Sequence, residues 1–424
     1  MQQVETGAHI FYSDDECLQA TIDEVGLRQK LEPHYPRKKN VGVWDGQSFI
    51  LRRERDLKST TWRDLARSVW RYGLSPCRLR DWVARQLPQF QRLCGASETV
   101  NRNIPEALKN LGLSAESKQS AESYLRNRIS PKFSREAIQA TARALFAKDL
   151  NELNGLAALV AMNPADTDFV RPVLGGNYNL IYRLLKLSEA KLHLNTQVTK
   201  ITRSDHGGYH LTTAKTDLLD PSSTTEAAEY DAIIIATPLQ GSGLDLDMAV
   251  HLTEALKPYV ERHVTHFTSP LSDKLSPLFF NVSTAEEIPD TIFTTGTNFD
   301  LGFYSIDSSL AHVGMDGCVA TSENLYKVVS AAPTEDGMIA KLLGNSEDST
   351  LENLGVRWIH RQIWSHASPK FRNGAMLDNI EVADGVFYTG VGEEVVSSLE
   401  MSCRMGQLAA NLLYYSKWAP ELEA

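Results

Sequence analysis

The residues best suited to chemistry in this sequence are backbone groups at glycine-bearing turns, not reactive side chains. Gly175-Gly176-Asn177 precedes an amphipathic stretch that predicts a helix over residues 179–187. Glycine lets a backbone approach a ligand closely, and the free N–H groups at the start of a helix favour anionic groups. Taken alone, the segment is better explained as an ordinary loop-to-helix turn.

A second segment predicts a strand that ends in Thr237-Pro238. The apolar run 232–236 is typical of a strand buried on both faces. Ligands of α/β proteins bind beyond the carboxyl ends of such strands, which is where Thr237 and Pro238 stand. A core strand without a ligand would show the same pattern.

The third segment lies near the C-terminus. Residues 386–389 are apolar and predict a strand, which Gly390 and Gly392 interrupt before a long helix. Either serine of Ser397-Ser398 can cap this helix, and Glu400 falls in its first turn, where the helix dipole favours a carboxylate. Each segment is a weak signal, but the three in this order predict a shared ligand site.

The elements that position these turns follow from the rest of the pattern. Residues 60–146 are predicted to be helical, divided at Pro88, Pro105 and Pro131. Residues 41–51 predict a hairpin that turns at Asp45-Gly46, residues 217–229 a surface loop, and residues 260–364 the short strands of one mixed sheet. The predicted fold is therefore α/β, with a discontinuous cofactor domain interrupted by a substrate domain.

The predicted boundaries are 1–50 for the first cofactor-domain segment and hairpin, 51–169 for a helical substrate or cap region, 170–240 for the middle cofactor-domain segment, 241–380 for the mixed-sheet substrate domain, and 381–424 for the C-terminal cofactor-domain segment.

Composition excludes several classes of protein. The chain has 424 residues, enough for two intertwined domains. Its net charge of -10 argues against nucleic acid as a partner. No apolar run approaches the roughly 18 residues that cross a bilayer, and the N-terminus shows no secretory signal. Five scattered cysteines without a C-x-x-C pair argue against structural zinc and against a full disulfide framework, so the compartment stays open.

The three segments, together with a stretch near the start, resemble the prenylcysteine oxidase (prenylcysteine lyase) family of FAD-dependent, amine-oxidase-like flavoproteins. The resemblance runs from about residue 5 to residue 418. Its most specific parts are Glu5-Thr-Gly-Ala, Asn154-Gly-Leu-Ala-Ala-Leu-Val, Gly175-Gly176-Asn177, Asp231 to Pro238 and Ser398-Leu-Glu-Met-Ser.

This resemblance implies a flavoprotein oxidase fold of the FAD/NAD(P)-binding type and a thioether oxidase activity. The implied substrate is a lipophilic molecule such as farnesyl- or geranylgeranylcysteine, oxidised by molecular oxygen to a prenyl aldehyde, cysteine and hydrogen peroxide. The implied compartment is the lysosome, the vacuole or the secretory pathway. The implied FAD-binding residues are Glu5, Gly7, Ala8, Gly175, Gly176, Asn177, Val198, Thr237, Pro238, Gly390, Gly392 and Glu400. No side chain is identified as catalytic and no metal site is expected.

The sequence departs from the family pattern in two places. It lacks the opening strand–G-x-G-x-x-G–helix, a unit of roughly 30 residues, so the predicted fold is N-terminally truncated. We expect that the gene model starts at an internal methionine, the other explanation being a short paralogue that binds flavin poorly. In addition, Trp364-Ser-His-Ala-Ser-Pro stands where relatives tend to carry an aromatic residue just before the proline.

Two alternatives to a prenylcysteine oxidase stay open: a repurposed flavin oxidoreductase for another lipophilic, prenylated metabolite, and a flavin-free prenyl-binding protein. Basic residues outnumber acidic ones between Arg52 and Arg92, with Trp62, Trp70 and Trp82 among them. This pattern is compatible with peripheral membrane contact. A solvated helical face with its aromatic side chains toward the core explains it at least as well.

Overall fold

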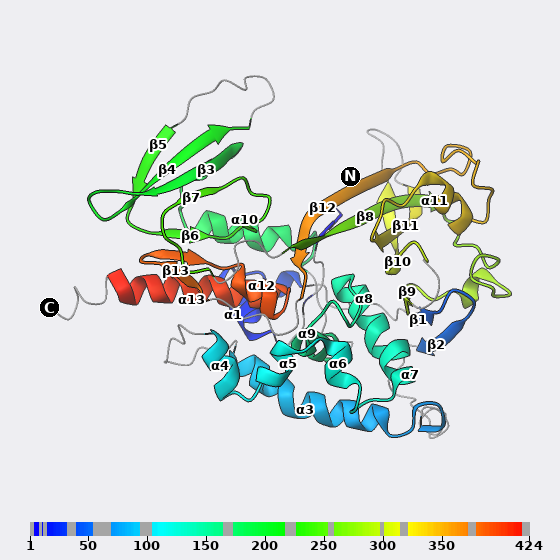
Figure 1. Cartoon of the computed structure of the whole chain (residues 1–424). Coiled ribbons are helices and arrows are strands. Elements are labelled where there is room, and N and C mark those ends of the chain that lie inside the picture. Colours follow the sequence, from blue (N-terminus) through cyan, green and yellow to red (C-terminus); the bar gives the residue numbers. More distant parts are fainter. Residues whose placement is uncertain are drawn as a thin grey trace.

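The computed structural model describes residues 4–7, 11, 15–31, 40–53, 69–93, 104–163, 173–216, 226–252, 258–296, 301–313, 321–371 and 379–417. These residues form three β-sheets and a layer of helices (Figure 1). The chain is therefore α/β with mixed sheets.

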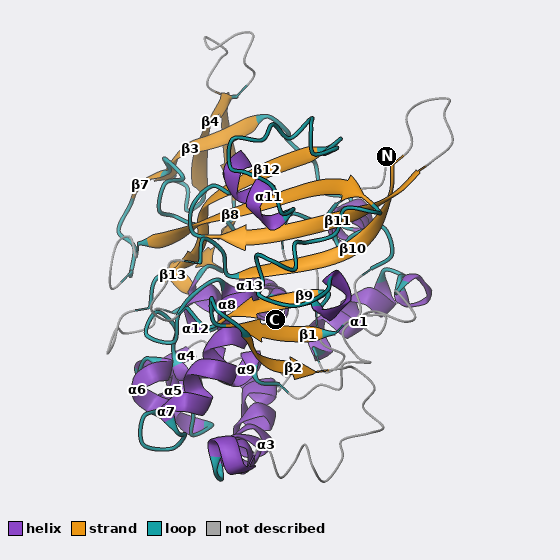
Figure 2. Ribbon diagram, turned by 90° about the vertical axis from the view of Figure 1, so that its right-hand side faces the viewer, coloured by secondary structure: helices purple, strands orange, loops and turns teal. Residues whose placement is uncertain are grey.

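The largest sheet has seven strands in the order β12-β8-β11-β10-β9-β1-β2, and Figure 2 shows its face. Strands β1 and β9 run parallel and the other neighbours antiparallel, which confirms the predicted mixed sheet. The predicted hairpin β1–β2 is also confirmed, and it pairs with β9 of this sheet. The bounds are β1 Val41–Trp44, β2 Phe49–Arg53, β8 Tyr259–Pro270, β9 Thr291–Thr294, β10 Ser305–Val313, β11 Thr321–Ser330 and β12 Ile359–Pro369.

Aromatic side chains hold the core of this sheet, which helix α11 (Asp336–Leu342) helps to cover. The Trp44 ring lies nearly parallel to that of Phe303 at 6.0 Å and edge-on to that of Phe280 at 5.2 Å. Buried aromatic pairs of this kind add about 0.5–1.5 kcal/mol beyond the removal of their surface from water. This packing holds in place the strands of the sheet, some of which also carry polar side chains.

The helical layer lies below the sheets in Figure 1. Its bounds are α3 Ser75–Leu93, α4 Ile104–Asn110, α5 Ser114–Lys118, α6 Ala121–Leu125, α7 Pro131–Phe133, α8 Ala140–Phe146 and α9 Gly155–Ala161, with a π-helical turn over Ser134–Gln139. Pro105 and Pro131 stand at helix starts, as predicted. The prediction that Pro88 ends a helix was wrong: Pro88 lies inside α3, where Trp82 and Phe90 anchor the helix to the core on both sides of it.

The three segments of the predicted cofactor site belong to smaller sheets. Strand β14 (Val386–Tyr388) runs parallel to β6 (Ile233–Ile235) and antiparallel to β13 (Glu381–Ala383). A four-stranded sheet has the order β5-β4-β3-β7, and the predicted helix at residues 179–187 is α10 (Tyr178–Leu187). The strands of this sheet are β3 Thr196–Arg203, β4 Tyr209–Lys215, β5 Glu226–Tyr230 and β7 Asp245–Asp247.

Two predictions for this region were wrong. Strand β6 is not buried on both faces, since Ile234 is 43% exposed. The exposure alternates along the strand: Ile233 and Ile235 are buried on one face, and Ile234 points to the opposite face. Part of the predicted loop at 217–229 is strand β5, which pairs with β4 and so satisfies its backbone groups. Residues 217–225 lie outside the described part.

The C-terminal segment consists of α12 (Val391–Val395) and α13 (Leu399–Lys417). Ser398 Oγ accepts the N–H of Met401 at 3.2 Å, which confirms the predicted serine cap of the long helix. Helix α13 packs against α1 (Glu16–Glu24), and a disulfide joins Cys17 to Cys403. The main core contains side chains of the helical layer, β6, β14 and α13, so segments 51–169, 170–240 and 381–424 share it.

Candidate functional site

Two of the predicted turns meet although they are far apart in the sequence. The Glu5 carboxylate accepts the backbone N–H of Asn177 at 2.8 Å. Gly176 has φ +111°, and a Cβ there would lie 3.2 Å from the same carboxylate and 2.9 Å from the Tyr178 ring. Only glycine fits this backbone and this contact. The structure therefore joins the Glu5–Gly7 segment to the turn before α10.

A lysine of the large sheet lies directly against the Glu5–Gly7 segment. Lys327, on β11, donates to the carbonyl oxygens of Glu5 at 3.3 Å and Gly7 at 3.1 Å. Burial lowers the pKa of Lys327 to about 8, although the charges of Asp307 and Glu5 oppose this. The ammonium group therefore fixes the backbone of this segment and supplies a positive charge beside it.

The space next to Gly7 is bordered by an aromatic side chain. A Cβ on Gly7 would meet no atom closer than the Trp364 ring, at 4.0 Å. Trp364 is 41% exposed, so the ring has room for a ligand on its free surface. Ala8 lies outside the described residues. The backbone of Gly7, the ring of Trp364 and the charge of Lys327 together form a cradle that suits a flat, polar-edged group.

The second pair of predicted turns lies at one edge of the parallel strands. The Thr389 N–H donates to Ile235 O at 3.1 Å, so the chain ends of β6 and β14 are adjacent. Thr237 and Pro238 follow one strand and Gly390 follows the other. The structure thus brings these residues to the same carboxyl edge, where ligands of α/β proteins bind.

Gly390 and Gly392 are also needed for packing inside the protein, independently of any ligand. A Cβ on Gly390 would overlap the Tyr388 ring, and a Cβ on Gly392 would overlap the Met405 side chain. Both glycines are therefore required by the packing of the protein itself. Their role in binding a cofactor stays a prediction.

Two of the predicted site residues, Glu400 and Val198, make contacts within the protein, and their role in binding a cofactor stays a prediction. Both oxygens of the Glu400 carboxylate accept N–H groups at the start of α1, from Cys17 and Leu18, each at 2.9 Å. The Arg404 guanidinium lies 3.3 Å from Glu400. Its carboxylate therefore joins α13 to α1. Val198 lies in β3 and packs against the main core.

Tyr259 connects the edge of the parallel strands to helix α12. Its N–H donates to Gln240 at 2.8 Å and its hydroxyl donates to the Glu393 carboxylate at 3.2 Å. The ring meets that of His366, a half-buried residue, edge-on at 5.8 Å. Burial raises the pKa of Tyr259, which therefore stays protonated and keeps donating.

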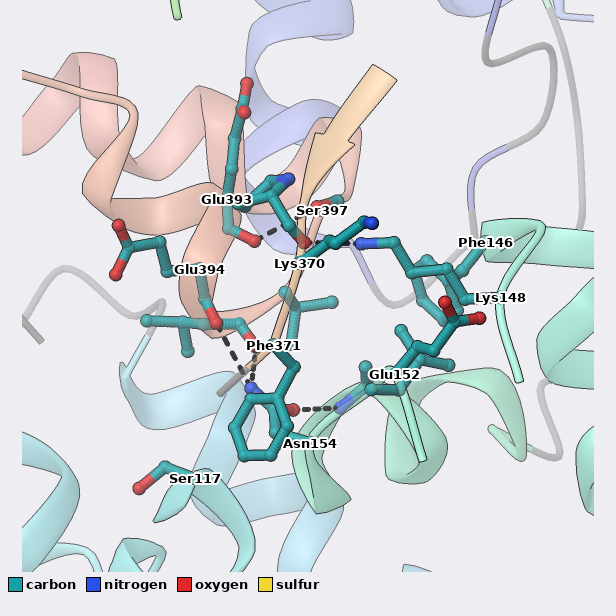
Figure 3. Close-up of a pocket in the computed structure, with 15 residues that line it drawn as sticks. Ser117, Phe146, Lys148, Glu152, Asn154, Lys370, Phe371, Glu393, Glu394 and Ser397 are labelled. Atoms are coloured by element: carbon teal, nitrogen blue, oxygen red, sulfur yellow. Dashed lines mark hydrogen bonds between the residues drawn. The ribbon is translucent and has the colours of Figure 1, made fainter. Parts of the chain in front are cut away.

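A cavity of about 40 Å³ opens beside α12, enclosed by residues 146–157, 369–371 and 393–397 (Figure 3). Asn154 forms one wall: its amide oxygen accepts the Ala157 N–H at 2.8 Å, and its amide nitrogen donates to Val395 O at 2.8 Å. Asn154 thus caps α9 and holds α12 in place. A cavity of this size accommodates a small polar group, since one water needs about 10–15 Å³.

Lys148 is the buried charge of this cavity, with 3% of its surface exposed. Its ammonium group points to Pro369 O, which accepts a hydrogen bond at 2.5 Å (Figure 3). Burial, with the charge of Arg262, lowers the pKa of Lys148 to about 7, while Glu152 and Glu393 oppose the change. Burial also raises the pKa of Glu393, against the effects of Tyr259 and Lys148.

Sequence reasoning did not identify Lys327, Tyr259 or Lys148 as site residues. Lys327 lies on β11, a strand that was not predicted, and Tyr259 begins β8 just before the predicted sheet region at 260–364, so the sequence prediction marked neither position. Lys148 follows α8 as a single lysine, and no local pattern marks it. Its significance comes from three distant segments that enclose it.

Two features are absent from the described part of the chain. No group of three or more His, Cys, Asp or Glu side chains there is arranged to hold a metal ion. None of the helices described is both long and apolar enough to span a bilayer.

The sequence is similar to proteins of one family along nearly its whole length. The sequence profile of the family described as prenylcysteine lyase matches residues 56–424. Prenylcysteine oxidase 1-like of Bos taurus is 27% identical over 100% of this chain and 82% of its own length. Prenylcysteine oxidase 1 of Bos taurus is 22% identical over 98% of this chain and 79% of its own. Farnesylcysteine lyase of Arabidopsis thaliana is 21% identical over 96% and 77%.

Proposed function

Because this chain belongs to the prenylcysteine lyase family, we propose that it is an FAD-dependent thioether oxidase that acts on prenylated cysteine. In this reaction a C–H bond beside the sulfur is oxidised, water adds to that carbon, and the carbon–sulfur bond breaks. The products are a prenyl aldehyde, free cysteine and hydrogen peroxide, with molecular oxygen taking up the two electrons.

One observation carries the proposal: the Glu5–Gly7 segment, the turn at 175–177 and Lys327 are joined by hydrogen bonds across the whole chain. These groups, with Thr237-Pro238 and Gly390 at the strand edge, would hold the FAD. When bound, FAD supplies the two-electron oxidation of the carbon beside sulfur. The residues of the chain bind and orient, and no side chain is assigned as a base.

Two further features support contact with a membrane and an oxidising compartment as the place of this reaction. Trp70 is 89% exposed and Leu74 61% exposed at the start of the helical layer, which favours peripheral contact with a membrane that holds a lipophilic substrate. The buried Tyr72 and Trp82 belong to the core instead. The Cys17–Cys403 disulfide favours an oxidising compartment, such as the secretory pathway or the lysosome.

The test uses the full chain titrated with FAD and followed by the visible absorbance of the oxidised flavin. We expect binding, and then conversion of farnesylcysteine to farnesal, cysteine and peroxide in equal amounts. Turnover of another prenylated compound in place of farnesylcysteine would establish the repurposed oxidoreductase. Binding of a prenyl ligand without any flavin would establish the prenyl-binding protein.

A matched pair of variants places the cofactor. Gly7→Leu fills the space beside Trp364 and should weaken FAD binding about tenfold or more. Gly406→Leu is the control, because a Cβ there also meets nothing within 4 Å but lies on the outer side of α13. Equal FAD affinity of the two variants would contradict the proposed position.

A further inference from the structure

Two cations, the buried Lys148 in the cavity wall and the half-buried Arg262 behind Phe146, have fewer anionic partners among the described residues than their burial requires. Arg262, on β8, donates to Phe146 O, and its Nε is buried without a hydrogen-bond partner. Lys148 uses one of its three donors on Pro369 O. Neither forms an ion pair with a carboxylate of the described residues. Buried charges are normally paired, because burying an isolated charge costs several kcal/mol.

A third cation strengthens the local positive potential. The charges of Arg262 and Lys370 both act on Lys148 and oppose its protonation. The nearby carboxylates Glu152 and Glu393 compensate only in part, and Glu393 already accepts the Tyr259 hydroxyl. An anion placed in the cavity would neutralise this cluster and accept the remaining Lys148 donors.

The cavity adjoins the predicted cofactor site. Glu393 borders the cavity and follows Gly390 and Gly392 within α12, and Tyr259 connects it to the turn after β6. The cavity walls also include apolar side chains, Phe146, Leu153 and Phe371. A small anionic group attached to an apolar neighbour therefore fits the space.

We propose that this cavity binds the α-carboxylate of the cysteine part of the substrate, with Lys148 as its main hydrogen-bond donor. The assignment rests on the proposed function for the identity of the substrate. It makes the enzyme specific for the free acid, since an ester of the same cysteine brings no charge to the cations. It also fixes one end of the substrate, so that the thioether is held at a set distance from α12.

The experiment measures binding of farnesylcysteine and of its methyl ester to the full chain by tryptophan fluorescence. The acid should bind the wild type about 10- to 100-fold more tightly than the ester, the usual range for hydrogen bonds to charged groups. Lys148→Met should remove this difference by weakening the acid alone, and Lys148→Arg should restore part of it. Lys186→Met, at an exposed lysine of α10, should change neither affinity.

Each outcome decides the proposal. Equal binding of acid and ester by the wild type overturns it, even if Lys148→Met fails to fold. Binding of acetate that depends on Lys148, without a difference between acid and ester, shows a site for free small anions and also overturns it. Because binding is measured without turnover, an acid preference that depends on Lys148 stands even if no aldehyde is formed. Aldehyde formation without that preference supports the oxidase and rejects the subsite.

Discussion

Two carboxylates on the C-terminal segment, Glu393 and Glu400, show how differently a buried charge can be held. Burial raises the pKa of both groups. Glu400 is surrounded by donors: two backbone N–H groups of α1 and the guanidinium of Arg404. Glu393 accepts one hydroxyl, from Tyr259, and borders a cavity.

The difference distinguishes a structural contact from a candidate ligand site. We call the contact of Glu400 on α13 with the start of α1 the joint. At Glu400, protein groups supply the partners that burial demands, so no room or need for a ligand is left. Glu393 and Lys148 carry opposite charges and both line the cavity, but they form no ion pair with each other. Perturbed charges in a cavity are typical of functional sites, whereas fully paired ones are typical of packing.

The largest expected effect tests the joint. Glu400→Ala removes the acceptor of two N–H groups and the nearer of the two carboxylates beside the buried Arg404, which keeps only Glu16 at 3.8 Å. We expect the free energy of unfolding to fall by about 3–5 kcal/mol, the range for breaking a buried pair. Urea denaturation followed by tryptophan fluorescence measures it.

Glu393→Ala is the matched control for this prediction. It removes one hydrogen bond and should cost about 1 kcal/mol. Similar losses in the two variants would show that the contrast between the joint and the cavity is wrong.

The covalent part of the joint gives the next largest effect. The Cys17–Cys403 disulfide closes 386 residues of chain and stabilises chiefly by restricting the unfolded state. Replacing both cysteines by alanine should lower the free energy of unfolding by about 2–4 kcal/mol. Cys77→Ala, at an exposed free thiol, should leave it unchanged. If the double variant matches this control, the non-covalent contacts between α1 and α13 hold the two helices together without the disulfide.

Local signals in the sequence were sufficient for much of the fold. Asp45-Gly46 predicted the hairpin, short strands were predicted over residues 260–364 although β11 was not among them, and Ser398 was one of two predicted caps. These features depend on residues close together in the chain. Pro88 was misread because the packing of its neighbours, and not its own geometry, decides whether the helix continues.

The candidate site was predicted only from local signals. The turns at 175–177 and 237–238 were proposed because glycine and proline mark them, and their role in binding a cofactor stays a prediction. The disulfide was not predicted, since five scattered cysteines do not reveal which of them pair. Lys148 was missed for the same kind of reason, because its burial results from segments around residues 148, 369 and 393. Glu400 was predicted to bind FAD, and its contacts with the start of α1 were not predicted.

The smallest effect, and the sharpest test of the cavity, is the dependence of stability on pH. The pKa of Lys148 is lowered from 10.5 to about 7 in the folded protein, by burial and by Arg262 and Lys370 against Glu152 and Glu393. Between these values the unfolded chain binds the additional proton, so the folded state gains stability as pH rises. The penalty for burying the charge is complete below about pH 7 and disappears toward pH 10.5.

Lys148→Met has no such penalty, so the free energy of unfolding of the wild type relative to this variant should rise by about 1 kcal/mol for each pH unit. Lys327 titrates in the same window but is present in both proteins and cancels. Urea denaturation of both proteins from about pH 7 to about pH 9 measures the slope. Parallel curves would mean that Lys148 keeps its proton in the fold, because the protein already supplies the anion that the cavity is proposed to take from the substrate.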